Sequence, residues 1–300
     1  MSTIQAYSDA TRPAASASNV GLTIFNTTTK DINVSDGTAW RVYEDDATTD
    51  NLLSLDFDGD DRLDTTYRMT SVTSYTVMFW MKSTDTTSYI CPVADTTSGS
   101  VRGNLEILRT SSTSGHYVIF RDSSGSTNNA KIVGNFSALC DGDWHHVAYV
   151  LDSSGTYTNV KIYEDGSLSV DEDARTANGW SNDNKTYGSG SADFAFGQRR
   201  TNNLGFTGKM DQMAFFESAL SGTDISNIWN SGSGGDLITL GFSPDAYYRV
   251  GYYSDDTNSN GSVASAGQDI GTVADYSGNA NNASQATTSK KPNYVADPGF

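Results

Sequence analysis

The chain has 300 residues, of which 36% are hydrophobic and 11% aromatic, and its formal net charge is −17. Phosphate recognition needs clustered Lys and Arg, so this acidic balance argues against nucleic acid as a partner. No stretch approaches the ~20 apolar residues of a membrane span, and the N-terminus lacks the basic and apolar regions of a secretion signal. Abundant turn-forming residues beside many aromatics are typical of short strands joined by turns.

Residues 1–50 contain short apolar patches separated by turn residues. Strand-like stretches lie at 20–26, 30–34 and 38–43. Two or three strands of this length are too small to bury a core of their own. We therefore expect this segment to pack on the following part of the chain or on another chain.

Residues 51–232 carry a regular series of strand-like stretches separated by turn signals. The predicted strands cover 52–57, 74–83, 89–94, 104–110, 116–122, 130–136, 144–152, 160–166, 194–199 and 208–220. In the stretch 74–83, alternation puts Tyr75, Val77, Phe79 and Met81 on one face. Short strands at regular spacing predict an antiparallel β-sandwich, so the expected fold class is all-β.

One helix is predicted within SGTDISNIWNSG (221–232). Ser221 is the expected N-cap, Ile225, Ile228 and Trp229 follow at helical spacing, and Gly232 ends the helix. Residues 233–300 are rich in Gly, Ser and Asn. We expect mostly loops there, with about two strands around the aromatic run AYYRVGYY.

The chain contains two cysteines, Cys91 and Cys140, each in or beside an apolar strand-like stretch. Two cysteines do not make a disulfide framework. We expect buried free thiols, and a bridge between them is the alternative.

Five stretches together resemble laminin G-like, concanavalin A-like jelly-roll modules. They are LSLDFDGDDRLD (53–64), SYTVMFWMK, DGDWHHVAYVLD (141–152), VKIYEDG and the closing segment 205–232. The resemblance implies a jelly-roll sandwich over residues 51–232 with one short helix. It also implies glycan binding as the commonest role, although a fold alone does not fix function.

Two flanking segments carry resemblances of their own. Residues 12–43 resemble segments of tail and capsid-associated proteins of bacterial viruses. This implies that residues 1–50 are an anchoring or assembly element that binds other virion proteins and forms a homo-oligomer such as a trimer; an extra hairpin on the sandwich is the alternative. AYYRVGYY and residues 273–284 resemble a lead-in strand and turn that normally precede the module. Here they follow it, so residues 233–300 either complete the same sandwich or dock on a neighbouring subunit.

The adjacent residues His145 and His146 raise the question of a metal clamp or a general base. Successive side chains of a strand point to opposite faces, so Trp144 and His146 share one face and His145 points to the other. Two adjacent histidines therefore do not converge on one ion. We expect both to be structural.

A saccharide site is expected in the long loop 173–191. Sugar rings stack on exposed aromatic side chains that are flanked by amides and carboxylates. The residues that suit this role are Trp180, Asn182, Asp183 and Tyr187, with Asn178 nearby. The alternative is a surface loop whose aromatics pack on the sandwich.

A cation site is expected at the acidic turn around Gly59. Asp56, Asp58 and Asp60, together with Asp61, offer the oxygen ligands that Ca²⁺ takes. The spacing does not fit an EF-hand, which needs Gly at its sixth position. The alternative is an acidic turn that shapes its hairpin, without a cofactor.

Enzymatic activity is not expected. Glycosidases need two carboxylates flanking the scissile bond, and the Glu–x–Asp–x–x–Glu pattern of the sandwich enzymes is absent from the sequence. No nucleophile elbow, phosphate loop or zinc spacing occurs either. The sequence favours a non-enzymatic structural protein on the virion surface, either a capsid decoration or a tail-associated adhesin. A stand-alone carbohydrate-binding lectin is the alternative, followed by a glycan hydrolase.

Overall fold

The chain forms two compact units, Met1–Asp50 and Asn51–Phe300. The computed structural model describes residues 5–8, 10–11, 13–14, 16, 18, 22–28, 32–35, 38, 40–42, 53–70, 72–86, 90–96, 105–109, 114–121, 128–152, 154, 159–173, 193–198, 204–250 and 256–296. Residues 233–300 therefore belong to the same unit as the predicted sandwich. Among the described residues, no helix is long and apolar enough to cross a membrane.

The N-terminal unit has a four-stranded sheet of its own. Its order is β1 (Gln5–Tyr7), β2 (Thr23–Asn26), β3 (Ile32–Ser35) and β4 (Trp40–Val42). The last three are the strands that the sequence predicts. β1 pairs in parallel with β2, whereas the other pairs are antiparallel. The short stretch QAY has no alternation to reveal it, so β1 was not predicted.

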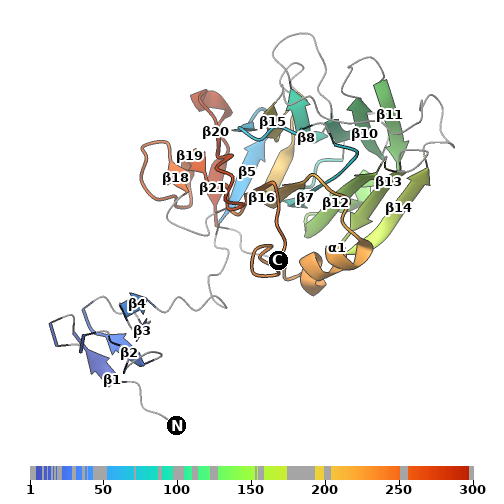
Figure 1. Cartoon of the computed structure of the whole chain (residues 1–300). Coiled ribbons are helices and arrows are strands. Elements are labelled where there is room, and N and C mark those ends of the chain that lie inside the picture. Colours follow the sequence, from blue (N-terminus) through green and yellow to red (C-terminus); the bar gives the residue numbers. More distant parts are fainter. Residues whose placement is uncertain are drawn as a thin grey trace. The chain divides into compact units, whose positions relative to one another are not determined.

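The second unit is a sandwich of two antiparallel sheets (Figure 1). The first sheet runs β14 (Ser167–Asp173), β13 (Asn159–Glu164), β12 (Trp144–Asp152), β7 (Ser74–Lys82), β16 (Thr207–Phe216), β5 (Ser54–Asp58) and β21 (Asn293–Val295), and β17 (Ala246–Tyr248) also pairs with β16. The second runs β11 (Asn128–Val133), β10 (His116–Arg121), β9 (Leu105–Arg109), β8 (Ile90–Thr96), β15 (Asp193–Phe196), β6 (Leu63–Thr65), β20 (Ala283–Ser284), β19 (Gln268–Val273) and β18 (Thr257–Asn258). The predicted all-β antiparallel sandwich is confirmed.

The first sheet is buried on both faces. Tyr75, Val77, Phe79 and Met81 of β7 all lie in the core between the sheets, as alternation predicts. Their neighbour Met78 lies in a second apolar cluster with Ala148, Val150 and the helix residues Ile225 and Ile228. A sheet covered on both faces needs near-continuous apolar strands, which explains why β7 is buried along almost its whole length.

The covering helix α1 (Gly222–Trp229) is capped as predicted. Ser221 Oγ accepts a hydrogen bond from the Asp224 amide, and Asp224 accepts one from the Ser221 amide, so the two residues form a capping box. The helix ends at Asn230, two residues before the predicted Gly232. Asn230 already has left-handed backbone angles (φ 50°), which Asn tolerates better than most residues. Within the second unit's described residues, 3₁₀ turns lie at Phe136–Leu139, Asn230–Gly232 and Thr288–Lys290.

The described part of the C-terminal segment supplies five strands, more than the two expected. β20 pairs with β6 in one sheet, β21 pairs with β5 in the other, and β19 pairs with both β20 and β21. The segment thus joins the two sheets of its own chain. Four of these strands have only two or three residues, too short for alternation to mark them.

Cys140 is a buried free thiol, as expected. Burial raises the pKa of this thiol to about 11, so it stays protonated at neutral pH. The side chain of Cys91 lies outside the described part of the chain.

Candidate functional site

The two adjacent histidines of β12 have separate surroundings, as strand alternation predicts. His146 is buried opposite Trp80 of β7, and the two ring centres are 5.4 Å apart. His145 instead lies between two carboxylates, with Nδ1 2.8 Å from Asp165 Oδ2 and Nε2 3.1 Å from Asp141 Oδ1. Asp165 also accepts a hydrogen bond from the His146 amide, so it ties the β13–β14 turn to β12.

The different environments shift the pKa values of the two imidazoles in opposite directions. The hydrogen bond with Asp165, helped by Asp141, raises the pKa of His145 to about 9. Burial lowers the pKa of His146 to about 4. At neutral pH His145 is a cation held by two carboxylates, and His146 is a neutral ring buried against Trp80.

Asp165→Asn should destabilise the protein in a pH-dependent way. The folded-state pKa of His145 lies above its unfolded value of 6.5, so the ion pair contributes fully below pH 6.5 and is lost as pH rises through about 9. We expect the variant to lose about 1–3 kcal/mol of unfolding free energy at pH 6 and clearly less at pH 9.5. Urea unfolding at both pH values measures this. Asp143→Asn removes the same charge from an exposed site and serves as the control; equal losses at both pH values would contradict the assignment.

The third histidine, His116, is at the centre of a buried polar cluster. Its Nδ1 is 2.7 Å from the Tyr149 hydroxyl, and its Nε2 is 2.9 Å from Glu164 Oε1. Burial works to raise the pKa of Glu164, but the interactions with His116 outweigh it and the pKa is lowered. Sequence reasoning missed this cluster because its residues are 33 and 48 positions apart in the chain.

The hydroxyl, imidazole and carboxylate of this cluster follow one another as they do in a catalytic triad. Their surroundings nevertheless suit a structural role. His116 and Tyr149 are both 0% exposed, so a substrate has no access to either. Burial also raises the pKa of Tyr149, which opposes formation of a nucleophilic phenolate. The cluster satisfies buried polar groups between the sheets.

At the acidic turn, Asp58, Asp60 and Asp61 bring carboxylate oxygens within 4.8 Å of one another. The Asp60 amide donates to Asp58 Oδ1, and the Asp58 amide donates to Asp61 Oδ2. Asp56 lies farther back in β5, opposite Lys209, and is not in this group. Of the residues expected around a cation, the structure thus brings Asp58, Asp60 and Asp61 together and leaves Asp56 apart.

The three carboxylates differ in charge. Asp61 is 5% exposed, and burial above all raises its pKa to about 7. Hydrogen bonding from the Asp60 amide lowers the pKa of Asp58. Asp61 therefore retains a proton in part of the molecules at neutral pH, while Asp58 is ionised.

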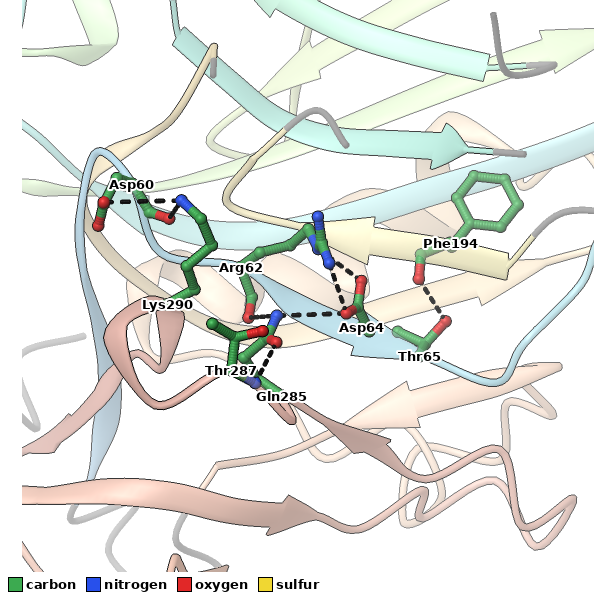
Figure 2. A network of polar contacts seen from close by, with 8 residues as sticks. All are labelled: Asp60, Arg62, Asp64, Thr65, Phe194, Gln285, Thr287 and Lys290. Carbon is green, nitrogen blue, oxygen red and sulfur yellow. Dashed lines mark hydrogen bonds and ion pairs between the residues drawn. The ribbon is translucent and has the colours of Figure 1, made fainter. Parts of the chain in front are cut away.

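The C-terminal segment contacts this hairpin directly (Figure 2). Lys290 Nζ lies 3.0 Å from the Asp60 carbonyl oxygen and 3.6 Å from its carboxylate. Gln285 donates to the Arg62 carbonyl and to Asp64, and Asp64 holds the Arg62 guanidinium with both oxygens. The chain's own cations thus neutralise part of the negative charge of the β5–β6 hairpin.

These contacts limit how well the turn suits Ca²⁺, which takes six to eight oxygen ligands. Three carboxylates are available, one of them close to Lys290 and another partly protonated. The arrangement fits the alternative reading, in which the acidic turn shapes its hairpin and holds the C-terminal segment. Calcium binding stays a prediction.

The loop expected to bind saccharide falls outside the described residues. This applies to Trp180, Asn182, Asp183 and Tyr187, which all lie between residues 174 and 192. Their role as a glycan site therefore stays a prediction as well.

The chain is similar to several solved structures. Matched structures include a protein from Bacteroides ovatus ATCC 8483 named as a carbohydrate-binding candidate (14% identity, TM-score 0.49, 79% of this chain and 58% of that one). A second is the SAP-like pentraxin of Limulus polyphemus (15% identity, TM-score 0.45, 62% of this chain and 84% of that one). A third is the receptor binding domain of botulinum neurotoxin mosaic serotype C/D (16% identity, TM-score 0.37, 54% of this chain and 37% of that one). The chain thus spans little more than half of the Bacteroides protein.

The curated proteins contain no match to this chain. Residues 57–226, more than half of the chain, match the family described as the concanavalin A-like lectin/glucanases superfamily. This match covers β6 to β16 and most of α1, including the strand with the histidine pair. The chain therefore belongs to the concanavalin A-like lectin/glucanase superfamily.

Proposed function

We propose that the protein is a non-enzymatic structural component of a bacterial virus particle, either a capsid decoration or a tail-associated adhesin. In this role residues 1–50 bind other virion proteins and assemble the chain into a homo-oligomer such as a trimer. The lectin-like sandwich is displayed on the virion surface for contact with glycan or protein.

The observation that carries this proposal is the division of the chain into two units with different characters. The N-terminal unit has its own four-stranded sheet, and its sequence resembles tail and capsid-associated segments. The second unit is a member of a superfamily whose name includes lectins. An attachment unit joined to a binding unit is the organisation that a displayed adhesin needs.

The described titratable clusters support binding rather than catalysis. A general acid–base pair must reach a bound substrate. His116 is sealed between the sheets, His145 is held by two carboxylates, and Asp60 faces Lys290. Each of these groups contributes to the structure through contacts within the chain.

A stand-alone lectin and a glycan hydrolase are the alternatives, and both make distinct predictions. A lectin binds glycan equally well with or without residues 1–50 and does not associate with particles. A hydrolase releases reducing ends from a polysaccharide.

The proposal predicts that the full chain co-sediments with purified virus particles. Particles prepared without the chain are mixed with either the full chain or a variant that lacks residues 1–50, and are then pelleted through sucrose. We expect the full chain in the pellet and the shortened chain in the supernatant, because attachment depends on the N-terminal unit. A mild surface variant of the second unit, Val263→Ala, is the matched control and should pellet like the full chain. Equal pelleting of both chains would overturn the assigned role of residues 1–50, and absence of both from the pellet would overturn the virion assignment.

A further inference from the structure

A hollow beside α1 has a chemical character that the sequence did not reveal. Its volume is about 650 Å³, within the ~300–1,000 Å³ typical of small-molecule sites. It is lined by Asp224, Ser226, Asn227, Trp229, Asn230, Ser231, Leu240 and Phe242. The lining thus combines two aromatic rings with hydroxyl, carboxamide and carboxylate groups from α1 and the residues after it.

The two aromatic rings of the hollow are fixed by packing against other parts of the chain. Trp229 packs so closely on the β13–β14 turn that a Cβ at Gly166 would lie 2.7 Å from Trp229 Cε3. Phe242 makes an edge-on contact with Phe216, with ring centres 6.4 Å apart and an interplanar angle of 82°. Rings that are already ordered lose little conformational entropy when a ligand stacks on them.

The polar groups of the hollow retain hydrogen-bonding capacity. Asn227 is exposed, and its carboxamide makes no hydrogen bond with the described part of the chain. Asn230 donates through Nδ2 to the Gly234 carbonyl, which leaves its Oδ1 as an acceptor. Asp224 uses Oδ2 in the capping box, so Oδ1 remains an acceptor too.

We infer that this hollow is a saccharide site that binds an uncharged oligosaccharide. Trp229 provides an apolar face for a pyranose ring, and the amide and carboxylate groups of α1 bind its hydroxyls. The ligand should be uncharged because the lining includes the carboxylate of Asp224 and the whole chain carries a net charge of −17. This inference rests on the proposed glycan contact and gives it a location on α1, separate from the loop 173–191.

The preference for a saccharide over an apolar peptide follows from the composition of the lining. Five of its eight residues are polar, and all five come from α1 or the two positions that follow it. An apolar peptide would bury these groups without partners, which costs free energy. A sugar supplies a hydroxyl for each of them.

The test measures binding of the full-length chain to four neutral hexasaccharides: maltohexaose, cellohexaose, mannohexaose and the hexamer of N-acetylglucosamine. Titration calorimetry with each probe gives the affinity, and polygalacturonate is the acidic comparison. We expect binding to at least one neutral hexasaccharide and none to polygalacturonate. Trp229→Ala should weaken that binding about tenfold or more, because a central aromatic contributes most to such a site.

Two further variants make the result specific to the hollow. Asn227→Ala, an exposed change on the helix surface, should leave the melting temperature unchanged and weaken binding about two- to tenfold through loss of one hydrogen bond. Trp144→Ala is the matched control, because Trp144 is half-buried on β12 and does not line the hollow. It should bind like the natural chain.

Binding that survives both Trp229→Ala and Asn227→Ala would overturn the site on α1 and leave the proposed glycan contact standing. Absence of binding to all four hexasaccharides, or binding to polygalacturonate alone, would overturn the inference as well. Failure of the virion proposal has a separate readout, the sedimentation of the chain with particles.

Discussion

Deleting residues 256–300 is expected to abolish cooperative folding of the second unit. The deletion removes β18 to β21, so it exposes an edge of each sheet at β5 and β6. It also removes Ile270, Val273, Ala283 and Tyr294 from the core between the sheets. Unpaired edges beside an open core favour aggregation. The deleted chain should be insoluble or lack a thermal transition in near-ultraviolet circular dichroism.

A single substitution tests the packing of residues 256–300 on the sandwich without removing any strand. Tyr294 is 0% exposed, and its hydroxyl lies within hydrogen-bonding distance of the Thr257 and Thr272 carbonyls. Tyr294→Ala should cost about 3–5 kcal/mol of unfolding free energy. Val263→Ala, in the same segment but 58% exposed, is the control and should cost little. A soluble, cooperatively folding chain without residues 256–300 would show that the segment is dispensable, contrary to its strand pairing.

Replacing His116 is expected to be the most damaging change to a single polar residue of the core. His116→Ala would leave the Tyr149 hydroxyl and the Glu164 carboxylate without their shared partner. Removing one member of a buried charged network costs about 3–5 kcal/mol. Urea unfolding followed by tryptophan fluorescence measures this loss through the transition midpoint at constant slope.

Tyr117→Phe is the matched control for β10. Tyr117 neighbours His116 in the strand and is half-buried, and its hydroxyl makes no hydrogen bond with the described part of the chain. We expect a change below about 0.5 kcal/mol, as for most surface substitutions. A loss below 1 kcal/mol for His116→Ala would show that the cluster contributes little to stability.

Local sequence patterns predicted much of the sandwich because they are strong in its central strands. β12 spans the predicted residues 144–152, and β7 differs from its prediction by one residue. The Ser221 cap and the apolar spacing of Ile225 and Ile228 located α1. The pairing of the C-terminal strands was not evident, because long-range partners such as β5 and β21 lie more than 200 residues apart.

The candidate sites were harder to predict than the fold. The three-dimensional grouping of His116, Tyr149 and Glu164 depends on strand register, which no local motif records. Asp61 lies in the acidic group and Asp56 does not, because the turn at Gly59 (φ 97°) folds the carboxylates after it back toward Asp58. The hollow beside α1 combines the exposed side of a helix with Leu240 and Phe242, which lie in a later segment with no recognisable pattern.

Electron microscopy of purified particles tests most directly the proposal that the chain is displayed on a virus particle. Gold-labelled antibody against residues 51–300 would be applied to particles from the source of the chain. The account predicts label on the outer surface of the capsid or along the tail. Unlabelled particles, with the chain found only in fractions that contain none, would contradict it.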